Sequence, residues 1–177
     1  RFANCDNITF ENLYIHGDQS DITTENQENK SPTFLQFITC KNITINNILA
    51  LDGLEPLVVH GTDNVNISDM TILNNEHGIL VSGTSTRVNI SNISHQQYAR
   101  DSRDGYVQTG MKLLGTCSNI NISNYNIEGY TREVFRIEGG NRININNISV
   151  NQISFGTEFD GIFNITEGNN ISISNVQ

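Results

Sequence analysis

Polar and apolar residues alternate in short stretches along the whole chain, and one such stretch recurs seven times. Its pattern is polar, Ile or Val, polar, apolar, polar, Asn or Asp, apolar. The copies span residues 7–13, 42–48, 64–70, 87–93, 119–125, 142–148 and 170–176. Alternation with a period of two is typical of a β-strand that is buried on one face. The pattern therefore predicts seven related strands that begin 22 to 35 residues apart.

The sixth position of every copy is Asn, or Asp in one case. The seven residues are Asn12, Asn47, Asp69, Asn92, Asn124, Asn147 and Asn175. An amide side chain offers both a donor and an acceptor, so copies stacked on one another can form a hydrogen-bonded ladder. We expect this ladder to point inward, which would prevent glycosylation at the Asn-x-Ser sequons of Asn92 and Asn147.

Two further features recur with the repeat. A second predicted strand precedes each copy, for example at residues 78–81, 134–137 and 161–165. A small residue stands three positions before the first Ile or Val of each copy, as a tight inward turn requires. These residues are Cys5, Cys40, Thr62, Ser85, Cys117, Gly140 and Gly168. Two strands and a tight turn in a unit that can be as short as 22 residues describe one coil of a solenoid.

The sequence thus predicts a single all-β domain over residues 1–177, a right-handed parallel β-helix of about seven coils. We also expect the chain to be part of a longer protein. An antiparallel sandwich has many short strands too. It gives no reason, however, for one column to stay Asn or Asp in every copy, so the β-helix is the better interpretation.

Composition narrows the range of partners. The net charge of −9 argues against nucleic acid, because binding to phosphates requires clustered Lys and Arg. No apolar run approaches the roughly 18 residues of a membrane span. The three cysteines fall in the small column and lack metal-ligand spacing, so we expect buried thiols, no metal and no cofactor. The sequence does not decide whether Cys5 and Cys40, on neighbouring coils, form a disulfide.

Two segments that interrupt the repeat are rich in polar and charged residues. Residues 95–106 combine a His, two Arg and two Asp, including Asp104, with Tyr98 and Tyr106. Aromatic rings stack on sugar faces, and charged groups bind sugar hydroxyls. This segment is therefore a candidate sugar site. Its alternative interpretation is a loop ordered by Arg–Asp pairs.

Residues 128–138 form the second interruption. Arg132 and Glu133 precede a predicted strand, on which Arg136 and Glu138 flank Ile137 and are expected to point outward. We expect Asp160, one coil later, in the column of Arg132. We place His77, three coils earlier, in that column as well. The resulting patch has Glu133, Asp160 and Asp104 as catalytic candidates. The substrate-binding candidates are Arg132, Arg136, Glu138, Tyr98, Tyr106 and His77.

Two reaction types fit these candidates. Glycoside hydrolysis uses two carboxyl groups, about 5–5.5 Å or about 6.5–9.5 Å apart. A lyase uses a base such as Arg132, Arg136 or His77 beside a uronate. The alternative is that these side chains are merely solvated. Carboxyl groups at glycosidase distances in a groove would favour the enzyme, whereas carboxyl groups paired with Arg132 and Arg136 on a flat face would favour a structural module.

Three phrases carry a resemblance to a known family. They are Asn-Cys-Asp-Asn-Ile-Thr-Phe-Glu-Asn-Leu-Tyr-Ile-His-Gly (4–17), Thr-Cys-Lys-Asn-Ile-Thr-Ile-Asn-Asn-Ile (39–48) and Asp-Gly-Ile (160–162). They resemble the pectin-lyase-like superfamily, and most of all the pectate-lyase-type β-helices of phage tailspikes and of bacterial polysaccharide-degrading proteins. The resemblance implies an extracellular, cell-surface or virion-borne protein that binds, and can depolymerise, a cell-surface polysaccharide. It also implies a homotrimer.

The motifs of one branch of that superfamily are not reproduced. Polygalacturonases carry Asn-Thr-Asp-Gly, an Asp-Asp pair, Gly-His-Gly and Arg-Ile-Lys in that order. This chain has Glu-Phe-Asp-Gly (158–161) last, Glu-His-Gly (76–78), Arg-Ile-Glu (136–138) and no Asp-Asp pair. We therefore do not assign the catalytic mechanism of polygalacturonases to this chain.

Two other functions compete with polysaccharide depolymerisation. One is a non-catalytic structural or adhesive module of a virion fibre or surface protein. The other is an ice- or mineral-binding face, which would need long Thr ladders. Thr9 and Thr44 are followed in their column by Asn66, Asn89, Asn121 and Asn144, which disfavours such a face.

Overall fold

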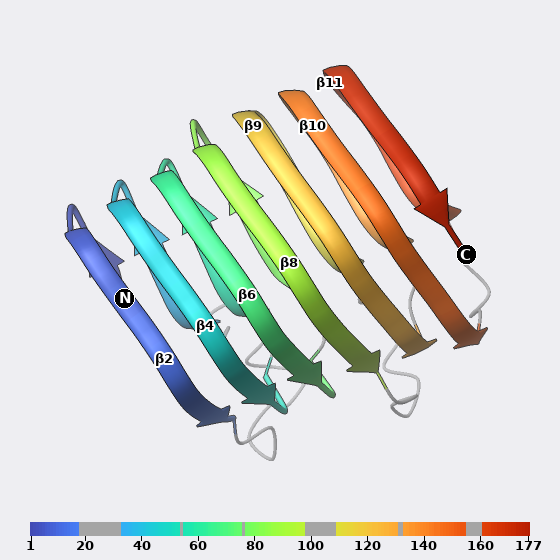
Figure 1. Ribbon diagram of the computed structural model, residues 1–177, viewed down its shortest axis with the longest axis horizontal. Helices are drawn as coiled ribbons and strands as arrows, with labels where there is room; N and C mark the ends of the chain where they lie inside the picture. Colours follow the sequence, from blue (N-terminus) through green and yellow to red (C-terminus); the bar gives the residue numbers. More distant parts are fainter. Residues whose placement is uncertain (18–32, 54, 76, 98–108, 131–132, 155–160) are drawn as a thin grey trace, which may run out of the picture.

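The computed structural model describes residues 1–17, 33–53, 55–75, 77–97, 109–130, 133–154 and 161–177. The regular structure in these ranges is β (Figure 1). The shorter strands are β1 (Phe2–Ala3), β3 (Thr33–Ile38), β5 (Glu55–His60) and β7 (Ile79–Ser82). The longer strands are β2 (Asp6–His16), β4 (Lys41–Leu51), β6 (Asp63–Leu73), β8 (Thr86–Gln97), β9 (Thr109–Tyr130), β10 (Glu133–Ser154) and β11 (Gly161–Val176). The described residues contain no helix with the length and hydropathy needed to cross a membrane.

The strands form one curled parallel sheet. Its order is β1-β3-β5-β7-β9-β8-β6-β4-β2, and β10 and β11 continue from β9. The curl arises at β9, whose first part pairs with β7 and whose second part pairs with β8. The longer strands lie side by side in one layer, with the shorter strands behind them (Figure 1). The all-β prediction is confirmed, and the parallel, curled sheet is compatible with a β-helix.

The predicted repeat alignment is also confirmed. Each strand pairs with its counterpart in the next copy of the repeat, so the first apolar positions of all seven copies stand in one column. That column is Ile8, Ile43, Val65, Val88, Ile120, Ile143 and Ile171. Every strand lies about 4.8 Å from its neighbour in such a sheet. One apolar row therefore continues through all the copies.

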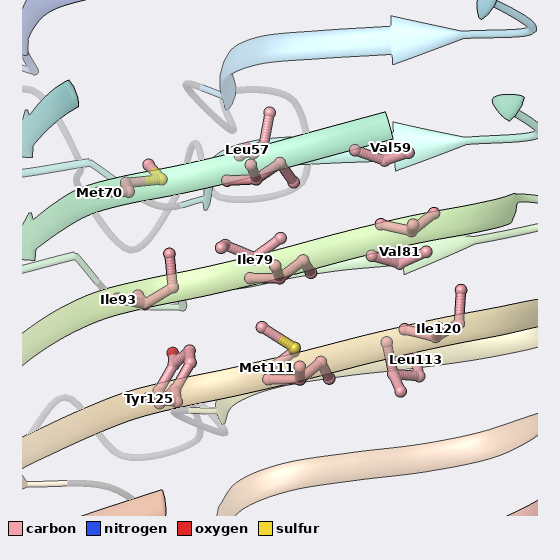
Figure 2. Close-up of a cluster of buried hydrophobic side chains, with 14 of the residues drawn as sticks. Leu57, Val59, Met70, Ile79, Val81, Ile93, Met111, Leu113, Ile120 and Tyr125 are labelled. Carbon is pink, nitrogen blue, oxygen red and sulfur yellow. The ribbon is translucent and has the colours of Figure 1, made fainter. Parts of the chain in front are cut away.

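The core lies between the two layers. Leu57, Ile79 and Met111 on the shorter-strand side face Met70 and Ile93 on the longer-strand side (Figure 2). These side chains are at most 2% exposed. Because every coil contributes the same positions, the core is thin but continuous.

The Asn column departs from expectation. All seven residues adopt left-handed backbone conformations, with φ between 52° and 56°, and their side chains are exposed. The expectation that they point inward is therefore wrong. A left-handed residue bends the strand and interrupts its inward–outward alternation, and Asn and Asp adopt this conformation more readily than most residues. Burial therefore does not protect Asn92 or Asn147 from glycosylation.

The ladder itself is confirmed. Asn47 Nδ2 donates to Asn12 Oδ1 at 2.7 Å, and Asn124 Nδ2 donates to Asn92 Oδ1 at 2.9 Å. The same bond joins Asn92 to Asp69, Asn147 to Asn124 and Asn175 to Asn147. The amides therefore connect successive coils along the outside of the sheet.

The small column forms the expected inward turn. Cys40, Thr62, Ser85 and Cys117 are buried. The Cys40 backbone N–H donates to Thr62 Oγ1 at 3.4 Å, and the Thr62 N–H donates to Ser85 Oγ at 3.2 Å. All three cysteines are free thiols, with Cys5 only half-buried. The hydroxyls of this column therefore satisfy backbone groups that the turn would otherwise leave without partners.

Candidate functional site

Charged side chains gather on the shorter-strand face, around the starts of β5, β9 and β10. Arg136 pairs in register with Lys112, and Glu133 pairs with Thr109. Met111 and Ile137 are fully buried, so Lys112 and Arg136, at alternate positions, point outward. We call Glu55, His77, Lys112, Glu133, Arg136 and Glu138 the charged patch.

Arg136 lies at the centre of the charged patch. Its Nε donates to Glu138 Oε1 at 2.6 Å, and its Nη1 lies 3.5 Å from Glu133 Oε1. The hydrogen bond to Glu138 is the main reason that the pKa of Arg136 is raised, and the negative charges of Glu138 and Glu133 add to the effect. The Arg136 and Glu138 side chains are about one-third exposed. They are thus held in place and still accessible to a ligand.

Glu133 is positioned differently from the other candidates. It is fully buried at the start of β10, where its Oε1 accepts a hydrogen bond from Thr109 Oγ1 at 3.3 Å. The sequence analysis placed it just before the strand, as part of a polar patch. Its burial leaves Glu138 as the accessible carboxylate of the pair bound to Arg136.

A second ion pair completes the charged patch. Lys112 Nζ lies 3.4 Å from Glu55 Oε1, and both side chains are only 18% exposed. Sequence reasoning missed this pair, because the two residues are 57 positions apart. One sequence feature could have placed Lys112 in the charged patch, namely the alignment of residues 111–114 with residues 135–138. This alignment puts Lys112 directly beside Arg136.

His77 falls in a different column from the one predicted. The register of Ile79 with Met111, and of Met111 with Phe135, places His77 level with Thr109 and Glu133. It therefore lies two coils before β10, in the column of Glu133 rather than that of Arg132. The prediction failed because it aligned His-Gly-Ile (77–79) with Asp-Gly-Ile (160–162), whereas the register places Ile79 level with Met111, Phe135 and Phe163. The Thr109 N–H donates to His77 Nδ1 at 3.4 Å.

The His77 imidazole is neutral at neutral pH. Burial is the main reason that its pKa is lowered to about 3, and the charge of Lys112 and the nearby His95 contribute to this shift. Because Nδ1 accepts the Thr109 N–H, the ring proton is on Nε2. His77 is therefore a neutral hydrogen-bond donor rather than a cation that could hold a uronate carboxylate.

His95 lies in the core rather than in a sugar-binding loop. It belongs to β8 and is fully buried. The Tyr125 hydroxyl donates to the Gly110 carbonyl oxygen at 2.9 Å and accepts from His95 Nδ1 at 3.1 Å. Burial lowers the pKa of His95 to about 4 and raises that of Tyr125. This pair is a structural feature of the core behind the charged patch.

An open groove of about 430 Å³ adjoins the charged patch. Glu138 belongs to both, because it pairs with Arg136 and also lines the groove. The other lining residues are Gly115, Thr116, Gly139, Gly140, Asn141, Glu167, Gly168 and Asn169. The glycines have no side chains that could fill the groove. The carboxylates and amides among the lining residues provide hydrogen-bonding groups. The groove can accommodate a small polar ligand next to Arg136.

Five predicted site residues cannot be compared with the structure. Tyr98, Asp104, Tyr106, Arg132 and Asp160 lie outside the described residues. Of the remaining candidates, Glu133, Arg136 and Glu138 are in direct contact, and His77 joins them through Thr109. Within the described ranges, no group of three or more His, Cys, Asp or Glu is placed to hold a metal ion.

Both Arg136 and Lys112 are engaged by carboxylates, and Glu133 and Glu138 bind the same guanidinium. Pairing of Arg136 with carboxylates is one part of the arrangement that favours a structural module, and Arg132, the other part, lies outside the described residues. No protein-family model matches this chain, and no curated protein or solved structure matches it either.

Proposed function

We propose that the chain is part of an extracellular or virion-borne right-handed parallel β-helix that binds a cell-surface polysaccharide through the charged patch and its groove. The observation that carries the proposal is the position of Glu138, which contacts Arg136 and lines the groove. A fixed guanidinium and carboxylate at the edge of a groove are groups that hold sugar hydroxyls, as charge-assisted hydrogen bonds are stronger than neutral ones. The proposal includes about seven coils, assembled as a homotrimer.

The charge balance favours a neutral or weakly charged sugar. Glu55, Glu133 and Glu138 contribute three negative charges, Lys112 and Arg136 contribute two positive charges, and His77 is neutral. The charged patch therefore has a net charge of −1. A polyuronate would be repelled by this balance. Cleavage is the second candidate, and it rests on the buried Glu133 beside the accessible Glu138.

The test is binding of the purified chain to a panel of neutral and acidic polysaccharides, measured with the release of reducing ends and of unsaturated products. We expect binding without either product, and a loss of at least tenfold in affinity for Arg136→Ala. Arg87→Ala is the matched control, because Arg87 is an exposed Arg that pairs with Asp63 on the other layer. New reducing ends would instead support a hydrolase, and unsaturated products a lyase. Absence of binding to every polysaccharide would support a purely structural module.

A further inference from the structure

Two of the three cysteines lie level with each other on neighbouring coils. The strand residues on either side of Cys5 pair in register with those on either side of Cys40. The Lys41 N–H donates to the Cys5 carbonyl oxygen at 2.9 Å, in agreement with this alignment. Because neighbouring strands lie about 4.8 Å apart, the two Cα atoms are within the range of about 4.4–6.8 Å that disulfides span.

The two thiols have the same orientation. Each donates to the carbonyl oxygen two residues before it, Cys5 to Ala3 at 3.3 Å and Cys40 to Ile38 at 3.4 Å. The Cys40 sulfur also lies 3.6 Å from the carbonyl oxygen of Phe2, which belongs to the coil of Cys5. The Cys40 thiol therefore reaches toward the neighbouring coil, in the direction that a bond to Cys5 requires.

A small movement of one coil is enough to form this bond. The Cβ atoms of a disulfide are about 3.5–4.5 Å apart, which is a few tenths of an ångström closer than the usual spacing of strands. Among the described strands, β1 pairs with β3 alone and β2 with β4 alone, and β2 lies at the edge of its layer (Figure 1). The coil of β1 and β2 can therefore shift without separating from a strand on its other side.

We propose that Cys5 and Cys40 are a site of oxidative modification, at which a disulfide joins the coil of β1 and β2 to that of β3 and β4. The oxidant is a small disulfide such as oxidised glutathione. Such oxidants persist outside the cytosol, in agreement with the extracellular location proposed above. The modification does not depend on the charged patch or its groove.

The reaction proceeds by two exchanges. Cys5 is half-buried and Cys40 is buried, so Cys5 is the thiol that meets the oxidant first. Its thiolate attacks one sulfur of oxidised glutathione and releases one glutathione thiolate. The deprotonated Cys40 sulfur then attacks the Cys5 sulfur of the mixed disulfide and releases the second glutathione. The two protein thiols are oxidised to one disulfide, and oxidised glutathione is reduced to two molecules of glutathione, which take up the two protons.

The disulfide would hold the part of the sheet that packs least completely. Ile8 and Phe10 on β2 are only half-buried, whereas Ile43 and Ile45, their partners on β4, are fully buried. A disulfide closes the loop over residues 5–40 and so restricts the unfolded chain. Oxidation should therefore stabilise this end of the sheet against unfolding.

Cys117 is the internal control. It lies in the same column and is fully buried, but Ser85 and Gly140 are its neighbours on the adjacent coils. Burial also raises the pKa of its thiol, which lowers the fraction of reactive thiolate. Cys117 should therefore stay reduced under conditions that oxidise the other two cysteines.

The experiment treats the folded, reduced chain with oxidised glutathione at pH 8. We expect the cysteines that react with a maleimide in denaturant to fall from three to one. Trypsin cleaves after Lys30 and Lys41, so mass spectrometry should show the peptide of Cys5 joined to that of Cys40. Thermal unfolding of the oxidised chain should occur about 4–10 °C higher than that of the reduced chain. Dithiothreitol should reverse each of these changes.

The variants identify the two partners. Cys117→Ser should form the same disulfide as the unaltered chain, whereas Cys5→Ser and Cys40→Ser should keep the melting temperature of their reduced forms after treatment. The assay on the unaltered chain decides the proposal even if a variant does not fold.

Three results would overturn the proposal. One is the persistence of three reactive thiols, and another is glutathione retained on Cys5 with no link to Cys40. The third is a disulfide between two chains through Cys5, which non-reducing electrophoresis would show as a species of twice the mass.

Discussion

The left-handed Asn residues are the clearest case in which one residue type is required by backbone geometry. Asn92 has φ of 55°, and its amide bonds to both neighbouring coils. Ala at this position would add the steric cost of a left-handed residue, about 1 kcal/mol, to the loss of the ladder. Gly adopts φ above zero without that cost. We therefore expect Asn92→Gly to retain about 1 kcal/mol more stability than Asn92→Ala in urea unfolding.

The matched control is Asn89→Ala, on the same strand. Asn89 is exposed and also belongs to a ladder, but it is not among the residues with positive φ. Its substitution should cost less than Asn92→Ala. Equal stabilities of Asn92→Ala and Asn92→Gly would show that the backbone conformation is not what selects Asn.

His95 predicts how stability depends on pH. The folded pKa is about 4 and the unfolded value is 6.5, so between these values the unfolded chain binds more protons. The contribution of His95 to stability is therefore complete above pH 6.5, falls as the pH drops toward 4 and levels off below it. The total loss assigned to His95 is about 3 kcal/mol. Unfolding free energies measured from pH 7.5 to 3.5 test this.

His95→Gln keeps a polar partner for Tyr125 but does not titrate, so its stability should depend less on pH over this range. His60→Gln is the control, because His60 is an exposed histidine bonded to Ser82. That variant should keep the full dependence. The same slope in His95→Gln and in the unaltered chain would exclude His95 as the titrating group.

At the scale of the strand, the period-two pattern was sufficient to predict the elements and their stacking. Every copy of the repeat lies on a strand, and the first apolar positions form one column as expected. The pattern could not give the direction of the Asn side chains, because a left-handed residue interrupts the alternation on which that inference relied. Asn7 and Asn42 belong to a second left-handed column that the sequence reasoning did not identify.

The candidate site was harder to predict from the sequence than the strands were. Arg136 and Glu138 were expected to point outward because they flank Ile137, and they do. The burial of Glu133 and the pairing of Lys112 with Glu55 depend on contacts between coils. Such contacts follow only from an alignment of the shorter strands, which insertions of different lengths conceal.

The junction of β7 with β9 is the element most sensitive to added volume. A Cβ at Gly78 would collide with the backbone carbonyl oxygen of Gly110 and lie 3.1 Å from the Tyr125 hydroxyl. Gly78→Ala should therefore destabilise the fold by about 3 kcal/mol or more, because the backbone cannot yield as a side chain can.

Gly61→Ala is the control. Its Cβ would lie 3.7 Å from the nearest atom, and only the left-handed φ of 57° adds a cost, of about 1 kcal/mol. Thermal unfolding should rank Gly78→Ala well below Gly61→Ala, and the reverse order would contradict the tight approach of β7 to β9.

At the scale of the molecule, the sheet pairs each coil only with its neighbours, so energetic coupling should be short-ranged. Ile67 pairs with Ile90 on the adjacent strand, whereas Ile145 lies three strands from Ile67, at roughly 14 Å. All three are buried, and each change to Ala should cost about 2–5 kcal/mol.

Double-mutant cycles in urea measure the coupling. Ile67→Ala with Ile90→Ala should show an interaction energy of about 0.5–3 kcal/mol, because the two cavities merge. Ile67→Ala with Ile145→Ala should add to within about 0.5 kcal/mol. Strong coupling of the distant pair would mean that the coils do not act through nearest-neighbour contacts. Coupling of the adjacent pair together with additivity of the distant pair is the behaviour of a one-dimensional stack of coils. In such a stack, a binding surface can extend over several coils without changing the coils beyond it.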